Sequence, residues 1–178
     1  MIFLGDVAIA PEDIIEHYGF SNIFGDKPLC INLEGAITYQ KKSPKVGLIN
    51  TYKFLDYFKE FNLSVVCLSN NHIADKEFGI NDTISFFKKK NIHTVGADIK
   101  KNTFQKPLFI NEYQIISFGW EVIGCIRSKT GQTGIYNLIP KDIITQVKNL
   151  IKENPKKKTI VMFHWNYEFE RFPQPAHR

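Results

Sequence analysis

Apolar and polar positions along the chain follow two different periods, which predicts strands that alternate with helices. Short apolar runs without helical spacing are typical of buried strands, and they lie at residues 1–6, 27–35, 63–72, 92–97 and 157–170. The segments between them carry helical spacing or helix start and stop signals, and they lie at residues 11–20, 51–62, 78–91 and 140–155. This alternation predicts an α/β fold built in layers.

Two helices have the clearest local signals. The helix predicted over residues 140–155 has Pro140 near its start and Pro155 beyond its end, as helix boundaries often do. The helix predicted over residues 51–62 is expected to present one apolar face to the core, formed by Tyr52, Leu55, Phe58 and Phe61.

The middle of the chain has a different character. Residues 106–125 read as two or three strands with tight connections, which indicates an antiparallel edge or a second sheet, and residues 131–137 read as a loop with two glycines. The chain has no internal repeat and no linker, and 178 residues are enough for one core. We therefore expect a single domain over residues 1–178.

Composition and charge argue against a nucleic-acid partner. Apolar residues make up 43% of the chain and include 15 Phe, which is typical of a globular protein. The formal net charge is +5, but 20 of the 23 basic residues are lysines. Nucleic-acid sites rely on arginine for bidentate contacts. We therefore interpret the lysine excess as a solvated surface and expect no nucleic-acid partner.

The cysteines and the N-terminus bear on the cellular compartment. Cys30, Cys67 and Cys125 are well separated, each lies in an apolar stretch, and an odd number without a CxxC motif predicts buried free thiols. The sequence shows no signal peptide and no apolar stretch of the ~20 residues that a membrane helix needs. We expect a cytoplasmic protein if Met1 is the native start, and a membrane-associated or extracytoplasmic one if an anchor was removed.

Polar side chains follow the predicted strands where each strand ends. They are Asp6, Asn32, Glu34, Asn70, Asn71, His72, His164, Asn166 and Glu168. In open α/β sheets, binding residues gather at the carboxyl ends of the strands, and carboxylate, carboxamide and imidazole groups together suit a divalent cation. Each residue alone has a simpler explanation, because Asp6 would also serve as a helix cap and His164 as a hydrogen-bonded core histidine. Four polar strand ends in succession favour a metal site.

Several segments resemble one known family. "FLGDVAIA", "INLEGAIT", "LSNNHIADKEFGINDTISFFKKKNIHTVGA" and "VMFHWNYEFERFPQP" resemble the CapA family of bacterial capsule and poly-γ-glutamate synthesis proteins, which is similar to the calcineurin-like metallophosphatases. The resemblance runs from Met1 to Arg178 and is weakest between residues 100 and 155. It implies a layered αββα fold with helices outside the sheets.

The resemblance also implies roles for individual residues. Asp6, Glu34, Asn71 and His164 take the places of metal ligands, with Glu34 as the carboxylate that bridges two ions, and His72 takes the place of the catalytic histidine that faces the phosphoryl group. Further site candidates are Asn32, Asn70, Asp75 and Glu168. The implied cofactor is one divalent ion, or two in the complete protein, drawn from Mn, Fe, Zn and Mg.

Two departures change what we expect of this chain. Ala8 stands where phosphatases often carry a histidine, which resembles the CapA branch itself, and the sequence stops at "PQPAHR" while the family continues to a histidine-rich "GHHPH" segment. One ion would then keep Glu34, Asn71 and His164, while a second ion would keep only Asp6 and Glu34. We expect weak metal binding and poor turnover from residues 1–178 alone, and an exposed strand at residues 159–165 that pairs with a second copy or with another polymer-synthesis protein.

Two functional hypotheses remain open. One is a metal-dependent phosphoester hydrolase that acts on a phosphorylated small molecule or an intermediate of surface-polymer synthesis, and the ligand set favours it. The other is a non-catalytic accessory subunit of a polymer-synthesis complex, which Ala8 and the missing histidine-rich segment favour.

Overall fold

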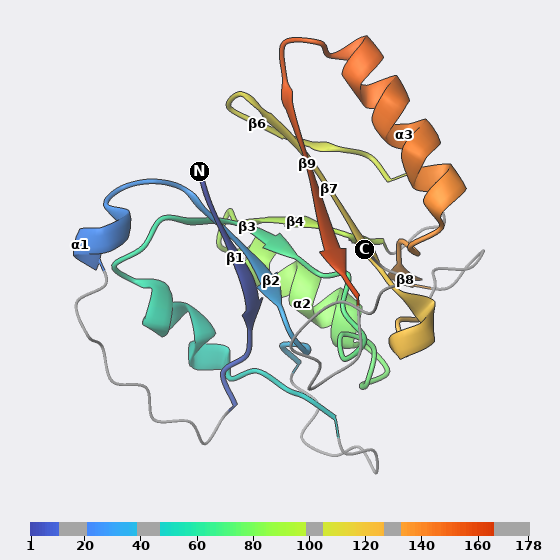
Figure 1. Ribbon diagram of the computed structural model, residues 1–178. Coiled ribbons are helices and arrows are strands. Elements are labelled where there is room, and N and C mark those ends of the chain that lie inside the picture. The colour runs from blue at the N-terminus through green and yellow to red at the C-terminus, as the bar shows by residue number, and fades with distance from the viewer. Residues whose placement is uncertain (11–20, 39–46, 99–104, 127–132, 166–178) are drawn as a thin grey trace.

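The computed structural model describes residues 1–10, 21–38, 47–98, 105–126 and 133–165 (Figure 1). The helix predicted over residues 11–20 and the candidates Asn166 and Glu168 lie outside these ranges. A short helix α1 (Ser21–Phe24) precedes the second strand.

The first sheet has four strands, all parallel. They are β1 (Ile2–Val7), β2 (Leu29–Leu33), β3 (Leu63–Cys67) and β4 (His93–Val95), in the order β1-β2-β3-β4. Every residue of β2 is buried, and so are four of the five residues of β3. Continuous apolar sequence is what a parallel strand covered on both faces requires, so the predicted strands are confirmed.

The second sheet comes from the middle and the end of the chain. It contains β6 (Leu108–Ile110), β7 (Tyr113–Gly119) and β9 (Lys158–His164), in the order β6-β7-β9. The β6–β7 pair is antiparallel and the β7–β9 pair is parallel. The expectation of a second sheet is therefore confirmed.

The prediction of a loop over residues 131–137 is wrong at two positions. Gly134 and Ile135 form the short strand β8, which pairs antiparallel with β5 (Ala97–Asp98). Ile135 is fully buried. Burying this side chain needs satisfied backbone groups, and the Ile135 N–H donates to the Ile126 carbonyl over 2.9 Å.

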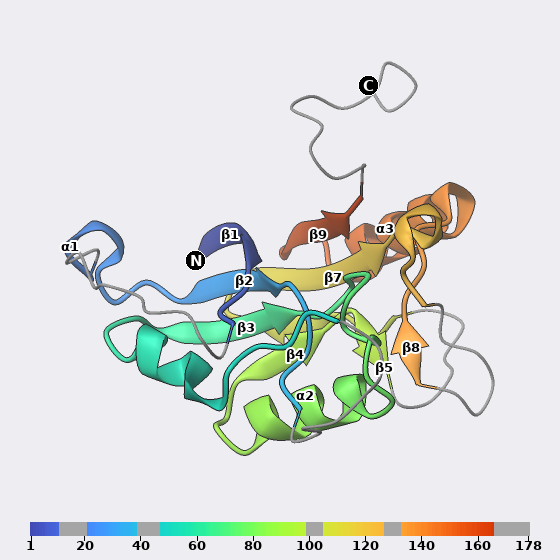
Figure 2. The same ribbon diagram turned by 90° about the horizontal axis from the view of Figure 1, so that it is seen from below.

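The two sheets pack face to face, with helices on their outer faces (Figures 1 and 2). A cluster that includes Cys30, Val65 and Ile115 fills the space between the sheets. The 3₁₀ helix η1 (Tyr52–Phe58) and α2 (Gly79–Lys88) pack on the first sheet, and α3 (Pro140–Glu153) packs on the second. The layers therefore run α, β, β, α, as predicted, in a mixed α/β fold of the metallophosphatase-like kind.

Residues 51–62 differ from the prediction in helix type and in part of the buried face, because Leu55, Phe58 and Phe61 pack against the core as predicted whereas Tyr52 does not belong to that cluster. Residues 52–58 form a 3₁₀ helix, and Phe54 is its fully buried residue while Tyr52 is 39% exposed. Phe54 stacks on Phe58 and meets Phe87 of α2 edge-on. A 3₁₀ helix aligns side chains three residues apart, so Leu55 and Phe58 share one face, and Phe54 is buried beside them by its ring contacts with Phe58 and Phe87.

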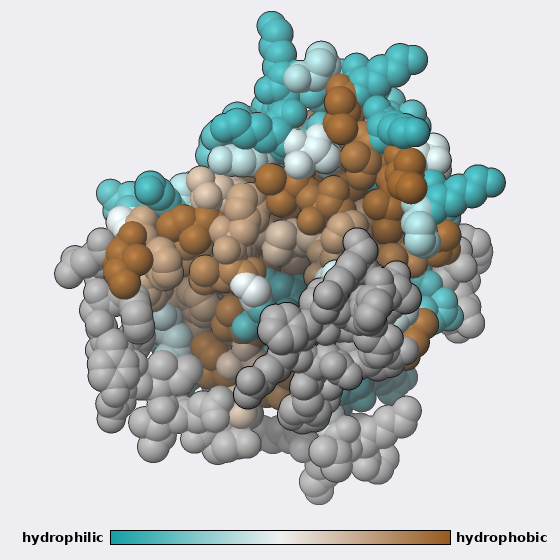
Figure 3. Space-filling model, viewed as in Figure 1, coloured by the Kyte–Doolittle hydropathy of each residue, from teal (hydrophilic) through white to brown (hydrophobic). Residues whose placement is uncertain are grey.

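Two strands lie at the edges of the sheets on the same side of the sandwich. Among the described strands, β1 pairs with β2 and β9 pairs with β7. On β9, Phe163 is 47% exposed, and Trp165 beyond it is 39% exposed. Apolar surface extends across the middle of this face (Figure 3). The position of β9 agrees with the expected exposed strand, whereas its pairing with a second copy or another protein stays a prediction.

The packing around η1 predicts a specific loss of stability. We expect Phe54→Ala to lower the free energy of unfolding by about 3–5 kcal/mol, because it leaves a cavity among fully buried aromatic rings. Phe109→Ala, at a position that is 49% exposed, is the matched control and should cost less than about 1 kcal/mol. Urea unfolding monitored by circular dichroism measures both values, and equal losses would contradict the assignment of Phe54 to the core.

Candidate metal centre

Three strand ends bring the predicted ligands together. Asp6 of β1 lies opposite Asn32 in the parallel register with β2, and Glu34 follows the end of β2. His164 ends β9 in the second sheet. Because the ends of β1, β2 and β9 meet at one place, residues far apart in the chain become neighbours.

Asn32 joins the two sheets at this point. Its side-chain Nδ2 donates to Asp6 Oδ1 over 2.5 Å and lies 3.2 Å from His164 Nδ1. Asn32 is buried, so its carboxamide is a fixed bridge between a carboxylate of the first sheet and an imidazole of the second.

Asp6, Glu34 and His164 form a compact group of potential metal ligands. One ligand atom from each lies within 4.8 Å of the others. His164 Nε2 is 3.4 Å from Glu34 Oε2, and His164 Nδ1 is 3.5 Å from Asp6 Oδ1. Asn71 adds a carboxamide oxygen 2.7 Å from His164 Nε2. The other three predicted ligands therefore surround the His164 ring.

The charges in this group suit a cation. Hydrogen bonding from His164 lowers the pKa of the Asp6 carboxyl, with a smaller contribution from Asn32, although partial burial opposes the shift. Asp6 is therefore ionised at neutral pH, as a cation ligand must be. The Glu34 and His164 side chains are only 15% and 12% exposed, so water screens charge poorly on their side of the group, whereas the Asp6 side chain is 57% exposed.

His72, the predicted catalytic residue, lies on the other side of Glu34. His72 Nε2 is 3.9 Å from Glu34 Oε1, and His72 Nδ1 is 2.8 Å from Asp75 Oδ2. The structure therefore brings together the five residues predicted to converge, and the further candidate Asp75 lies behind His72.

Asn70 has a structural place rather than a place among the ligands. It is fully buried. Its Oδ1 accepts from the backbone N–H groups of His72 and Gly35, over 2.9 and 3.3 Å, and its Nδ2 donates to the Leu33 carbonyl. Asn70 thus joins the end of β2 to the turn after β3, and the neighbouring Asn71 is the carboxamide that reaches His164.

Asn50 is a residue that the sequence did not single out. It is 1% exposed, its Oδ1 accepts from the Ile9 backbone N–H over 2.6 Å, and its Nδ2 donates to the Glu34 carbonyl over 2.8 Å. Asn50 therefore ties the segment after β1 to Glu34. No pattern signals this role, because Asn50 follows no predicted strand and carries no unusual spacing.

The comparison with known proteins shows the family of the chain. A family model, described as bacterial capsule synthesis protein PGA_cap, matches residues 1–178. The chain belongs to this family. The capsule synthesis family resemblance seen in the sequence is therefore confirmed.

Two curated relatives are similar to nearly the whole chain. The chain is 26% identical over 204 residues to the capsule biosynthesis protein CapA of Bacillus anthracis, and the aligned region covers 98% of this chain and 48% of that protein. The chain is also 26% identical over 199 residues to the PGA biosynthesis protein CapA of Bacillus subtilis (strain 168), and that aligned region covers 99% of this chain and 51% of the relative. The chain spans about half the length of the curated relatives it matches.

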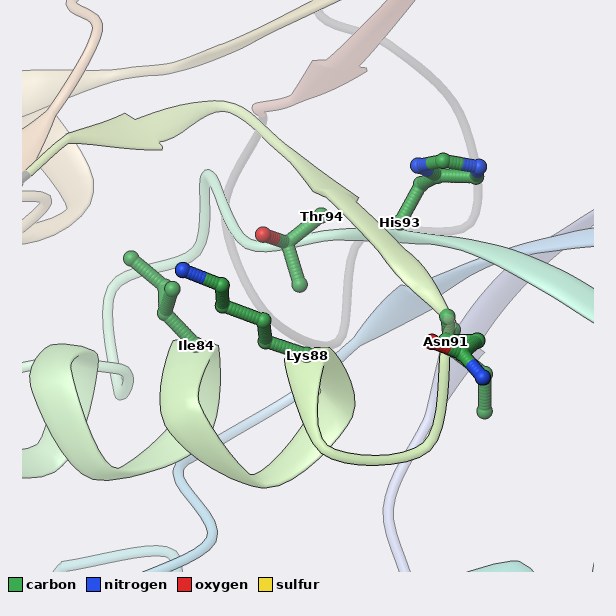
Figure 4. Close-up of a pocket in the computed structure, with 6 residues that line it drawn as sticks. Ile84, Lys88, Asn91, His93 and Thr94 are labelled. Carbon is green, nitrogen blue, oxygen red and sulfur yellow. The ribbon is translucent and has the colours of Figure 1, made fainter.

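A surface pocket lies apart from the metal-ligand group. It has a volume of about 440 Å³ at the turn between α2 and β4, and the described residues that line it are Ile84, Lys88, Asn91, Ile92, His93 and Thr94. Figure 4 shows Ile84 and Lys88 pointing from α2 toward the strand, and His93 directed away from Thr94. These residues are distinct from the ligand group.

No helix in the described ranges is long and apolar enough to cross a membrane.

Cys125 is a buried thiol beside the ligand group. Burial, followed by the negative charge of Glu34, raises the pKa of Cys125 to about 12. The pKa of Cys67 is also raised, chiefly by its hydrogen bond with Cys30, whose Sγ lies 3.8 Å away. All three cysteines are free and buried, as predicted.

The thiols should therefore be unreactive in the folded protein. At pH 8 a thiol with a pKa of about 12 is thiolate on the order of 1 part in 10⁴, and the thiolate is the nucleophile. We expect no rapid reaction of native protein with a disulfide reagent, and reaction of all three thiols after unfolding in urea. A thiol that reacts within seconds in the native protein would contradict the burial of these cysteines.

Proposed function

We propose that this capsule synthesis protein is a metal-dependent phosphoester hydrolase that acts in surface-polymer synthesis. The observation that carries the proposal is the group formed by Asp6, Glu34 and His164, whose ligand atoms lie within 4.8 Å of one another. Family membership supports a place in capsule or poly-γ-glutamate synthesis, and the ligand group supports the chemistry.

The donor set fits a divalent cation of borderline hardness. Two carboxylates and an imidazole, with the Asn71 carboxamide oxygen beside them, resemble the oxygen and nitrogen donors that Mn²⁺, Fe²⁺ and Zn²⁺ accept. Three protein ligands are the minimum for an open catalytic site. Because the other three donors surround His164, we propose that one ion binds there first and that a second ion needs further ligands. A bound cation would act as a Lewis acid toward a phosphoryl oxygen.

The protein's own residues have separate tasks in this proposal. Asn32 holds Asp6 and His164 in place by its contacts with both. His72 contacts Glu34 through the Nε2 side of its ring, and we propose that it donates a hydrogen bond to the leaving oxygen of the substrate. One such donor contributes roughly 10²- to 10³-fold to a rate.

The substrate class follows from this chemistry and from the family. We propose a phosphorylated small molecule or a phosphorylated intermediate of the surface polymer, and contact with other polymer-synthesis proteins. The accessory-subunit role is the alternative. It predicts that the ligand group binds metal without turnover.

Two histidine variants separate metal binding from catalysis. We expect His164→Ala to abolish binding of Mn²⁺, because it removes the central ligand, and to abolish hydrolysis with it. We expect His72→Asn to keep the metal and to lower the hydrolysis rate by roughly 10²- to 10³-fold. Isothermal titration with Mn²⁺ and turnover of p-nitrophenyl phosphate and sugar phosphates measure the two properties. The protein should be expressed from its complete reading frame, since the curated relatives are about twice as long.

His93→Ala is the matched control, because His93 is exposed and lines the separate pocket of Figure 4. It should change neither property. Equal metal loss in His72→Asn and His164→Ala would contradict the role of His72. Metal binding without turnover of any phosphoester would refute the hydrolase and favour the accessory role.

A further inference from the structure

Helix α3 carries apolar side chains toward solvent as well as toward the core. Its Ile143 and Leu150 are buried against the second sheet. Ile144 and Ile151, by contrast, are 54% and 51% exposed. Ile144, Val147 and Ile151 are spaced by three and four residues, so they form one stripe along the helix, which we call the isoleucine stripe. Val147 is partly buried against the core, so the stripe borders the buried face.

The isoleucine stripe lies on the side of α3 that faces β9. The opposite flank of the helix, which includes Gln146 and Glu153, lines a small pocket together with residues 105–107, just before β6. Because β6 and β9 lie on opposite sides of β7 in the sheet, the stripe is directed toward β9. There Phe163 stacks on Phe118, which belongs to the cluster beneath α3. The stripe and the half-exposed Phe163 therefore share the outer face of the second sheet.

Lysine side chains border the isoleucine stripe on its solvent side. Successive residues turn by about 100° around an α-helix, which places the exposed Lys141, Lys148 and Lys152 next to the stripe and away from the core. The acidic residues of α3, Asp142 and Glu153, fall on the opposite flank. In Figure 3, apolar and hydrophilic surfaces lie side by side over α3. This face of the helix is therefore both apolar and cationic.

We propose that this face, formed by the isoleucine stripe, Phe163 and the three lysines, docks on the surface of an anionic lipid bilayer. Apolar side chains leave water when they enter the headgroup region, and ammonium groups beside them meet the lipid phosphates. The proposal does not depend on the proposed hydrolase, because none of these residues belongs to the metal-ligand group.

Charge complementarity favours a bilayer over two other occupants. In a two-fold dimer the same patch faces itself, so a second copy would bring the lysines of both chains into like-charge contact, which is unfavourable. A soluble acidic polymer would neutralise the lysines but would leave the isoleucine stripe in water. A bilayer that contains anionic lipids satisfies both parts of the face.

Vesicle sedimentation with the full chain tests the proposal. We expect binding to vesicles of phosphatidylcholine that contain about one-third phosphatidylglycerol, and little binding to phosphatidylcholine alone. Added salt should weaken the binding, because it screens the attraction between lysines and lipid phosphates.

The double variant Ile144→Ser and Ile151→Ser tests the apolar part of the face. It should weaken binding by about 10-fold or more, because two apolar side chains no longer leave water. The matched control is the double variant Ile23→Ser and Phe78→Ser, at positions in α1 and at the start of α2 that are 66% and 48% exposed. It should change the binding by less than about 2-fold.

The double variant Lys148→Gln and Lys152→Gln tests the charged part. It should weaken binding by about 30-fold, the loss expected for two lysines at an anionic surface. Lys89→Gln and Lys90→Gln, at exposed positions after α2 on the other outer layer of the sandwich, give the same change in net charge. This control pair should weaken the binding by less than about 3-fold.

Unchanged circular dichroism spectra show that the variants are folded, and either pair alone decides the proposal if the other does not fold. Absence of binding to the anionic vesicles would overturn the proposal, and so would equal losses in the two lysine pairs. A loss in the lysine variant without a loss in the isoleucine variant would overturn it in favour of a soluble polyanion. A dimer in size-exclusion chromatography that Ile144→Ser and Ile151→Ser dissociates would assign the stripe to a second copy and overturn it as well.

Discussion

The site depends on hydrogen bonds from buried carboxamide side chains to the backbone where parallel strands end. Beyond the last sheet bond, backbone N–H and C=O groups need other partners, and leaving them unpaired in the interior is costly. Asn50 and Asn70 supply these partners between the segments that follow β1, β2 and β3. Because each carboxamide donates to one turn and accepts from another, the turns are fixed relative to one another, and the side chains they carry converge.

This arrangement separates supporting groups from reactive groups. Asn70 is fully buried and bonds only to backbone in the contacts described above, while the next residue, Asn71, reaches His164. Asn32 is the intermediate case, since its side chain is buried but contacts Asp6 and His164 themselves. The carboxylates and imidazoles keep partial exposure, which a site for an ion and a substrate requires.

The sequence predicted which residues would converge because strand ends are marked by a change from apolar to polar residues. Asp6, Glu34, Asn71, His72 and His164 all follow such a change, and the structure brings them together. Asn50 follows no strand, so nothing in its neighbourhood distinguishes it from an ordinary loop residue. Which of Asn70 and Asn71 joins the ligand group depends on which side chain turns toward the interior and which toward His164. The spacing of apolar residues does not determine this at a turn. Likewise, the burial of Phe54 depends on its ring contacts with Phe58 and Phe87, and the strand β8 depends on pairing with residues 36 and 38 positions away in β5.

The central claim is that the strand ends create a cation site at Asp6, Glu34 and His164, in a member of the capsule synthesis family. The most direct measurement is an anomalous difference map from crystals of the protein grown with Mn²⁺. The account predicts one peak bounded by these three side chains, with Asn71 turned toward the ion. If no peak appears there at saturating Mn²⁺, and the hydrogen bond between Asn71 and His164 is intact, the proposed cation site is contradicted.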